Sequence, residues 1–229
     1  RPAAHRCLRH FPPNYTFLGD TGVHTFTGGV TLKTSGSNTV TITDGSMSNV
    51  TSAIVVSNGA ASKLSYSSSP GTTTSGVAFS QQPVITVQDT FGNTVSGSSA
   101  TVTMAISTNP SSGTLSGTTT ATASSGIATF SGLKIDKVGS GYKLEASSSG
   151  WASATSSAFN ITAAGAASLS FTSTPSTATA GNAFDVVVTA FDLQGNTATG
   201  YTGTVTFTST DSAAVLPTNY TFLSSDGGV

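Results

Sequence analysis

The stretch Val84-Ile85-Thr86-Val87-Gln88-Asp89-Thr90-Phe91-Gly92-Asn93-Thr94 decides the fold of this chain. Its first half is rich in β-branched residues, which favour a strand, and its second half carries the Asp, Gly and Asn that favour a tight turn. The same pattern returns as Val187-Val188-Thr189-Ala190-Phe191-Asp192-Leu193-Gln194-Gly195-Asn196-Thr197. A strand and turn used twice indicate a tandem array of similar β modules.

The match extends in both directions from this stretch. Leu64-Ser65-Tyr66, upstream of the first copy, is matched by Leu169-Ser170-Phe171 upstream of the second. Gly126–Phe130, downstream of the first copy, is matched only at the beginning of the chain, by Gly22–Phe26. We therefore expect one complete module at 61–164, the early part of a second module at 165–229 and the late part of such a module at 14–60.

The two ends of this array also repeat each other. Asn14–Leu18 is repeated by Asn219–Leu223, and Asp226–Val229 nearly repeats Asp20–Val23. This repetition predicts a window on a longer array, cut within a module at each end. Because the ends of an intact sandwich lie far apart, we expect the two halves to be completed by a neighbouring copy. Such a head-to-tail contact does not close on itself and gives a filament.

Alternation of polar and apolar residues supports a half-buried sheet at Thr39–Thr43, Thr101–Ile106 and Thr204–Thr208. Turn signals separate short strands at regular spacing, and each module has a length of about 100 residues, as in an immunoglobulin-like sandwich. The sequence thus predicts an all-β fold of tandem immunoglobulin-like β-sandwiches, one complete and one split between the two ends. The single cysteine excludes the disulfide of antibody domains.

Composition excludes several classes of partner. Only 7% of residues are charged and the net charge is −1, so there is no basic footprint for nucleic acid. No apolar run is long enough to predict a membrane span in this window.

Residues 1–13 differ from the rest of the chain. Arg1–His10 contains every arginine and the only cysteine, Cys7. One interpretation is a basic arm that binds an anion or a partner. We favour the other, an atypical leader that is not native to the array, because three arginines make a weak basic patch.

The turns Asp89–Thr94 and Asp192–Thr197, together with Gly113–Tyr142, resemble bacterial immunoglobulin-like repeats of the invasin and intimin type, found in large prokaryotic surface proteins. The resemblance covers nearly everything from residue 14 onward. It implies an extracellular stalk, adhesin or fibre, at the cell surface of a prokaryote.

The turn residues Asp89, Gly92 and Asn93, and their counterparts Asp192, Gly195 and Asn196, are the candidate site residues. Carboxylates in such turns could hold calcium, which takes six to eight oxygen ligands. One carboxylate per turn is few for that cation, and Asp side chains commonly bond the backbone of their own turn. We therefore interpret these residues as structural and predict no metal and no cofactor.

No catalytic residues are predicted. His24 is the only histidine outside the leader, and the 9 carboxylates are scattered singly along the chain. Neither a Ser-His-Asp arrangement nor a pair of carboxylates for glycoside hydrolysis can be assigned. We expect a protein that is not an enzyme.

Trp151, the only tryptophan, is the candidate recognition residue. At a hairpin tip it could stack on a sugar or a neighbouring chain, or fold back on its own sandwich. The first hypothesis for function is therefore a structural repeat of an extracellular fibre or stalk whose partners are other copies of itself. The alternative is an adhesion module that binds a glycan or a receptor through loop tips.

Overall fold

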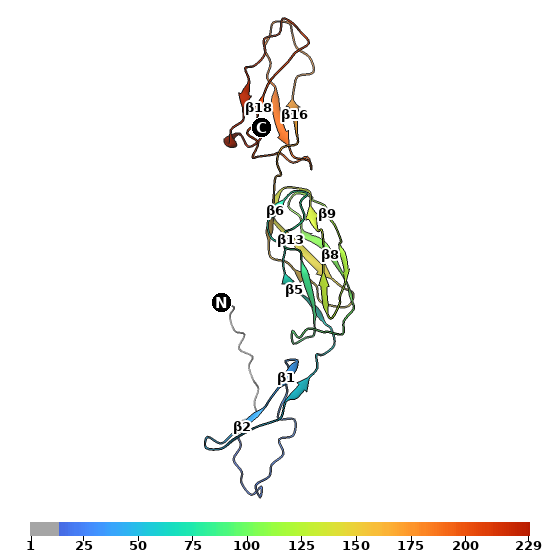
Figure 1. The fold of residues 1–229 in the computed structure, drawn as a ribbon, viewed down its shortest axis with the longest axis vertical. Helices are drawn as coiled ribbons and strands as arrows, with labels where there is room; N and C mark the ends of the chain where they lie inside the picture. Colours follow the sequence, from blue (N-terminus) through green and yellow to red (C-terminus); the bar gives the residue numbers. More distant parts are fainter. Residues whose placement is uncertain (1–13) are drawn as a thin grey trace.

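The computed structural model describes residues 14–229, and within them the protein is all-β, without an α-helix. The predicted leader lies outside the described residues. The chain forms an elongated rod with a compact middle and a looser part at each end (Figure 1). The ranges expected from the sequence, 14–60, 61–164 and 165–229, are called the N-terminal part, the middle module and the C-terminal part. The first and last parts lie at opposite ends of the middle module.

The middle module contains two main sheets. The first is antiparallel in the order β11-β7-β5, with β5 at Lys63–Ser68, β7 at Val84–Gln88 and β11 at Ile127–Thr129. The second runs β10-β8-β13-β15-β6, with β14 also on β13; the bounds are β6 Thr73–Thr74, β8 Thr101–Thr108, β10 Thr120–Thr122, β13 Gly139–Ser147, β14 Ala154–Thr155 and β15 Phe159–Thr162. A short pair, β9 (Leu115–Ser116) and β12 (Lys134–Ile135), completes the module.

The core of the middle module lies between these sheets. Strand β8 alternates between exposed threonines and the buried Val102 and Met104, which face Ile85 and Val87 of β7 within one apolar cluster. Leu144 of β13 is fully buried in the same cluster. Burying a side chain of this size stabilises a fold by about 1.5–3 kcal/mol. All buried residues of this cluster belong to the middle module.

The N-terminal part consists of two separate antiparallel ribbons. β1 (Gly36–Asn38) pairs with β4 (Ile54–Val56), and β2 (Thr41–Thr43) pairs with β3 (Ser48–Val50). No residue from 14 to 60 is buried. A two-stranded ribbon is marginally stable by itself in water.

The C-terminal part also has two ribbons, β16 (Ser168–Ser173) with β17 (Val187–Phe191) and β18 (Thr204–Val205) with β19 (Tyr220–Thr221), followed by the single 3-10 turn η1 (Ser224–Asp226). The first ribbon reproduces β5–β7 of the middle module. Leu169 pairs with Ala190 as Leu64 pairs with Val87, and a register shift follows Phe171 as it follows Tyr66.

The predicted all-β fold is confirmed, but two predicted strands are shorter than their alternation indicated. Thr39 and Val40 interrupt the strand expected at Thr39–Thr43, and only Thr204–Val205 of Thr204–Thr208 is a strand. The equivalent strands of the middle module, β13 and β8, pair with each other over most of their length. In the terminal parts that partner is missing, so the backbone groups have no ladder to join.

Candidate functional site: two joints and two open faces

The turn that follows β7 is held by the carboxylate of Asp89. Its Oδ1 accepts hydrogen bonds from the N–H groups of Phe91 and Asn93, both at 2.9 Å, and Gly92 has a φ of 89° that suits glycine. The side chain of Asn93 donates to Asp89 Oδ2 at 2.8 Å. The turn after β17 is built in the same way, with Asp192 accepting from Gln194 and Asn196.

The first turn also reaches out of the middle module into the N-terminal part. Asn93 donates from Nδ2 to the carbonyl oxygen of Lys33 at 2.8 Å, and its Oδ1 accepts from the N–H of Ser35 at 2.9 Å. Asp89 Oδ2 accepts from the N–H of Gly59, in the segment that links the two parts, at 2.8 Å. Three hydrogen bonds thus join the middle module to the N-terminal part, and we call this set of contacts the first joint.

The second turn makes the same joint with the middle module. Asn196 donates to the carbonyl oxygen of Asp136 at 2.8 Å and accepts from the N–H of Val138 at 3.3 Å. Asp192 accepts from the N–H of Ala164 at 3.2 Å and from the hydroxyl of Ser75 at 2.5 Å. The backbone partners Asp136, Val138 and Ala164 match Lys33, Ser35 and Gly59 in the repeats, whereas Ser75 has no counterpart at the first boundary. The same backbone contacts are therefore built twice along the rod.

Both carboxyl groups at the joints are strongly favoured in the ionised form. Burial alone raises the pKa of Asp89, but hydrogen bonds from Asn93, from the Gly59 N–H and from the turn backbone outweigh it and lower the pKa to about 2. For Asp192, burial is likewise outweighed, first by the Ser75 hydroxyl and then by Asn196, and the pKa is about 2. Hydrogen-bond donors therefore keep both groups charged at neutral pH, and within residues 14–229 neither group forms a salt bridge.

These donors also bear on the calcium alternative. Both oxygens of Asp89 accept N–H groups, so a cation would have to displace hydrogen bonds that hold the turn and the joint. Among residues 14–229 no cluster of three or more His, Cys, Asp or Glu side chains is placed to hold a metal ion. The geometry supports a role in the joint.

Trp151 lies in the turn that follows Gly150, and its backbone N–H points to the Ser148 carbonyl oxygen at 3.4 Å. The indole is half-buried and packs against the core cluster of the middle module. The structure thus places this side chain on its own module, which is one of the two arrangements expected from the sequence.

The C-terminal part presents an open apolar face. Its ribbons border a groove with a volume of about 430 Å³, whose apolar lining is Leu169, Phe171, Val188, Val205 and Phe207. Leu169 is 46% exposed, whereas Leu64 at the equivalent position of the middle module is 5% exposed. Phe184 is likewise exposed where its equivalent Phe79 is buried.

The N-terminal part presents the matching set of exposed apolar residues. Phe26 is 46% exposed and its equivalent in the middle module, Phe130, is 1% exposed. Val30 is also exposed, whereas its equivalent Leu133 is fully buried. Each terminal part therefore carries core-type residues without a core to cover them, and patches of this kind mark interaction surfaces.

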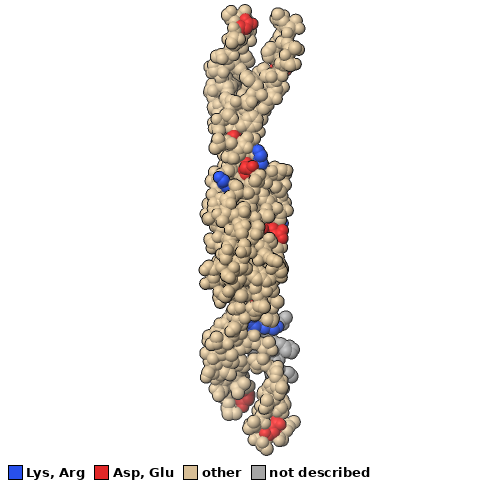
Figure 2. Space-filling view, turned by 90° about the vertical axis from the view of Figure 1, so that its right-hand side faces the viewer, with Lys and Arg blue, Asp and Glu red and all other residues tan. Residues whose placement is uncertain are grey.

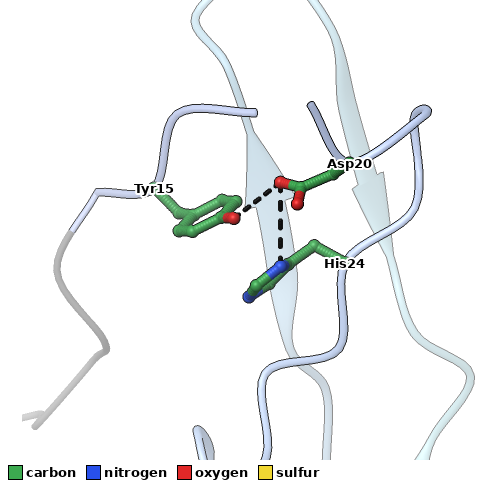
Figure 3. A network of polar contacts seen from close by, with 3 residues as sticks. All are labelled: Tyr15, Asp20 and His24. Carbon is green, nitrogen blue, oxygen red and sulfur yellow. Dashed lines mark hydrogen bonds and ion pairs between the residues drawn. The ribbon is translucent and has the colours of Figure 1, made fainter. Parts of the chain in front are cut away.

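His24 belongs to a small polar network in the N-terminal part (Figure 3). Its Nδ1 lies 3.8 Å from Asp20 Oδ2, which accepts the Tyr15 hydroxyl at 2.6 Å, and the Tyr15 ring stacks on the imidazole. The repeat at the other end has the same Tyr–Asp contact without a histidine: the Tyr220 hydroxyl donates to Asp226 at 2.9 Å. This contact closes the same turn in both copies, which assigns it a structural role.

The face of the rod drawn in Figure 2 carries few charged groups. Most of the charged groups visible on that face lie at the ends of the middle module and toward the tips of the rod. The described residues include no helix long and apolar enough to cross a membrane.

Comparisons with known proteins identify no family for this chain. No protein-family model matches the chain, and no curated protein matches it. Among solved structures, domains 4–9 of the surface layer protein SbsC are similar over 71% of this chain, with 17% sequence identity and a TM-score of 0.33. The match covers 25% of that protein's chain.

Proposed function

We propose that this chain is a structural repeat of an extracellular fibre or stalk at a prokaryotic cell surface, in which each copy completes the split sandwich of the next. The middle module is the rigid spacer. The observation that carries the proposal is the burial of the same sequence positions in the middle module and their exposure in both terminal parts, as at Leu64 and Leu169 or Phe130 and Phe26.

The placement of the open faces makes the contact intermolecular. The N-terminal and C-terminal parts lie at opposite ends of the middle module, so they do not meet within one rod (Figure 1). A contact between unlike ends repeats indefinitely in a line. Copies could follow one another in one polypeptide or exchange strands as separate chains, and the mass of native material under denaturing conditions distinguishes these two forms.

The repeated joint supports a mechanical role for the rod. The turns at Asp89 and Asp192 fix neighbouring parts through hydrogen bonds to backbone atoms on both sides. Each such bond contributes about 1 kcal/mol net. The joints therefore limit bending between parts and keep the spacing of a fibre regular.

Sedimentation velocity over a range of concentrations tests the proposal on the full chain. We expect species larger than the monomer that grow with concentration. Phe26→Asp should keep the chain monomeric, because a charge would enter an apolar core. Val55→Asp is the matched control: Val55 is exposed, and its equivalent in the complete module is the exposed Asn160. A wild-type chain that stays monomeric at every concentration contradicts the proposal.

A further inference from the structure

The middle module supplies a template for the contact between copies. There, β11 lies beside β7 in antiparallel register, with Ala128 opposite Ile85 and Thr129 opposite Val84. Gly126 precedes β11, and its carbonyl oxygen accepts the N–H of Val87 at 2.8 Å.

The described residues of the C-terminal part reach the entrance to the equivalent strand. Gly228 occupies the position of Gly126: its carbonyl oxygen accepts the N–H of Ala190 at 2.8 Å, and its φ is 82° where that of Gly126 is 77°. Among the described residues the only strand that pairs with β17 is β16, and Phe191 at the end of β17 also forms an isolated bridge with Thr197. The edge at Val187 and Val188 is open, and an open edge is a template for another strand.

The residues that continue the pattern are in the N-terminal part. Gly22 has a φ of 84° and corresponds to Gly126 and Gly228. The residues after it, His24, Thr25 and Phe26, correspond to Ala128, Thr129 and Phe130. Residues 14–23 duplicate a segment that the C-terminal part already holds at 219–229, so the incoming strand begins at His24.

From this correspondence we infer that a second copy of the chain binds by adding His24–Phe26 as a third strand on β17, with His24 opposite Val188 and Thr25 opposite Val187. The inference rests on the proposed function and specifies the contact that joins the copies. Phe26, like Phe130, then enters the core.

Most of the remaining core positions of the incoming part are also apolar, although Asn38 stands where the middle module has the buried Tyr142. Val30 and Leu32 stand where the middle module has Leu133 and Ile135, and Val40 stands where it has Leu144, all three of which are fully buried. Ile54 and Val56 of β4 correspond to the buried Phe159 and Ile161 of β15, and β1–β4 already has the pairing of β13 with β15.

One pair differs between the template and the inferred contact. Ile85 faces Ala128 in the middle module, whereas the smaller Val188 would face the larger His24. The methylene lost at Val188 offsets only part of the added imidazole, so this pair is packed more tightly than its template and places a polar ring where the template has Ala128.

Disulfide trapping tests the register directly. Thr25 and Val187 correspond to Thr129 and Val84, which lie one residue beyond the hydrogen-bonded pair at Ala128 and Ile85 in the alternating antiparallel ladder. Side chains of such non-hydrogen-bonded pairs are the closer ones. Both variants carry Cys7→Ser, so each chain has one thiol.

An equimolar mixture of Thr25→Cys and Val187→Cys chains should give a disulfide-linked dimer on a non-reducing denaturing gel after mild oxidation. The control mixture, His24→Cys with Val187→Cys, places the two thiols on opposite faces of the sheet. Because thiols on opposite faces cannot reach disulfide geometry, this mixture should give roughly 10-fold less dimer.

Equal cross-linking in both mixtures, or none in either, overturns the inferred register. Light scattering on the same mixtures separates this failure from that of the proposed function. Association without the specific cross-link refutes the pairing of His24–Phe26 with β17 and leaves assembly of copies standing. Monomers throughout refute both.

Discussion

The side chain of Asn93 accepts a hydrogen bond from the N–H of Ser35 at 2.9 Å, across the boundary between the middle module and the N-terminal part. The same side chain donates to Lys33 and to Asp89, so one amide connects a turn to the module before it. Because Asn196 repeats this arrangement at the next boundary, the orientation of successive parts is set by side chains that belong to the turn motif.

Replacing Asn93 with Ala should loosen the first joint without unfolding the middle module. The amide of Ser35 loses its acceptor, and a net loss of about 0.5–1.5 kcal/mol corresponds to roughly 2- to 10-fold faster hydrogen exchange at that amide. NMR-detected exchange measures this. The amide of Phe79, bonded to the Leu133 carbonyl inside the module, is the internal reference. Asn182→Ala, in an exposed turn, is the control, and equal rates at Ser35 in both variants would contradict the assignment.

Acid should weaken the joint held by Asp192. The pKa of this carboxyl is about 2 in the fold, below the ordinary value of about 3.9 for an unfolded aspartate. The fold therefore favours the carboxylate, and this contribution to stability is complete above about pH 4, decreases as the pH falls from about 4 to 2, and is absent below that.

Melting temperatures measured from pH 6 to pH 2 test this dependence. Asp192→Asn should flatten the decrease between pH 4 and pH 2, while Asp185→Asn, on the exposed segment before β17, should leave it unchanged. An Asp192→Asn profile with the full wild-type slope would show that this carboxyl does not contribute.

Equivalent phenylalanines should have different effects on stability. Phe130 is buried in the complete core, so Phe130→Ala should cost the middle module about 3–5 kcal/mol of unfolding free energy. Phe26 at the equivalent position is exposed in the single chain. Phe26→Ala should therefore leave unfolding of the dilute chain nearly unchanged and weaken self-association. Urea unfolding and sedimentation measure the two effects, and a large loss of stability from Phe26→Ala in the monomer would be inconsistent with an open face.

Trp151→Ala should lower the stability of the middle module, because the indole packs on its core, and should leave assembly intact. Thermal unfolding and sedimentation of the variant separate the two effects. If the variant instead loses binding to a glycan array that the wild type binds, while its stability stays the same, the adhesion hypothesis gains over the structural one.

The sequence predicted the all-β fold because its signals are local. The alternation at Thr101–Ile106 gives β8, and the repeated strand and turn at Val84–Thr94 and Val187–Thr197 mark the positions of β7 and β17. The lengths of the terminal strands could not be predicted from alternation, because a strand such as Thr204–Val205 extends only as far as it has a partner.

The joints were also beyond the sequence-based interpretation, which had the Asp89 side chain bond the backbone of its own turn. Their bonds to Lys33, Ser35 and Gly59 depend on how the parts are placed in space. The sequence did hold a signal for this role. An asparagine follows the glycine in both turns, although the glycine by itself provides the left-handed conformation that the turn needs. The Tyr15–Asp20 contact could similarly have been inferred from the repeat at Tyr220 and Asp226.

Electron microscopy of the assembled chain tests the central claim most directly. If one copy completes the next, concentrated protein should form unbranched strings in which complete sandwiches follow one another at a regular spacing, and Phe26→Asp should abolish them. Single rods at every concentration, each with an incomplete part at both ends, would contradict the account.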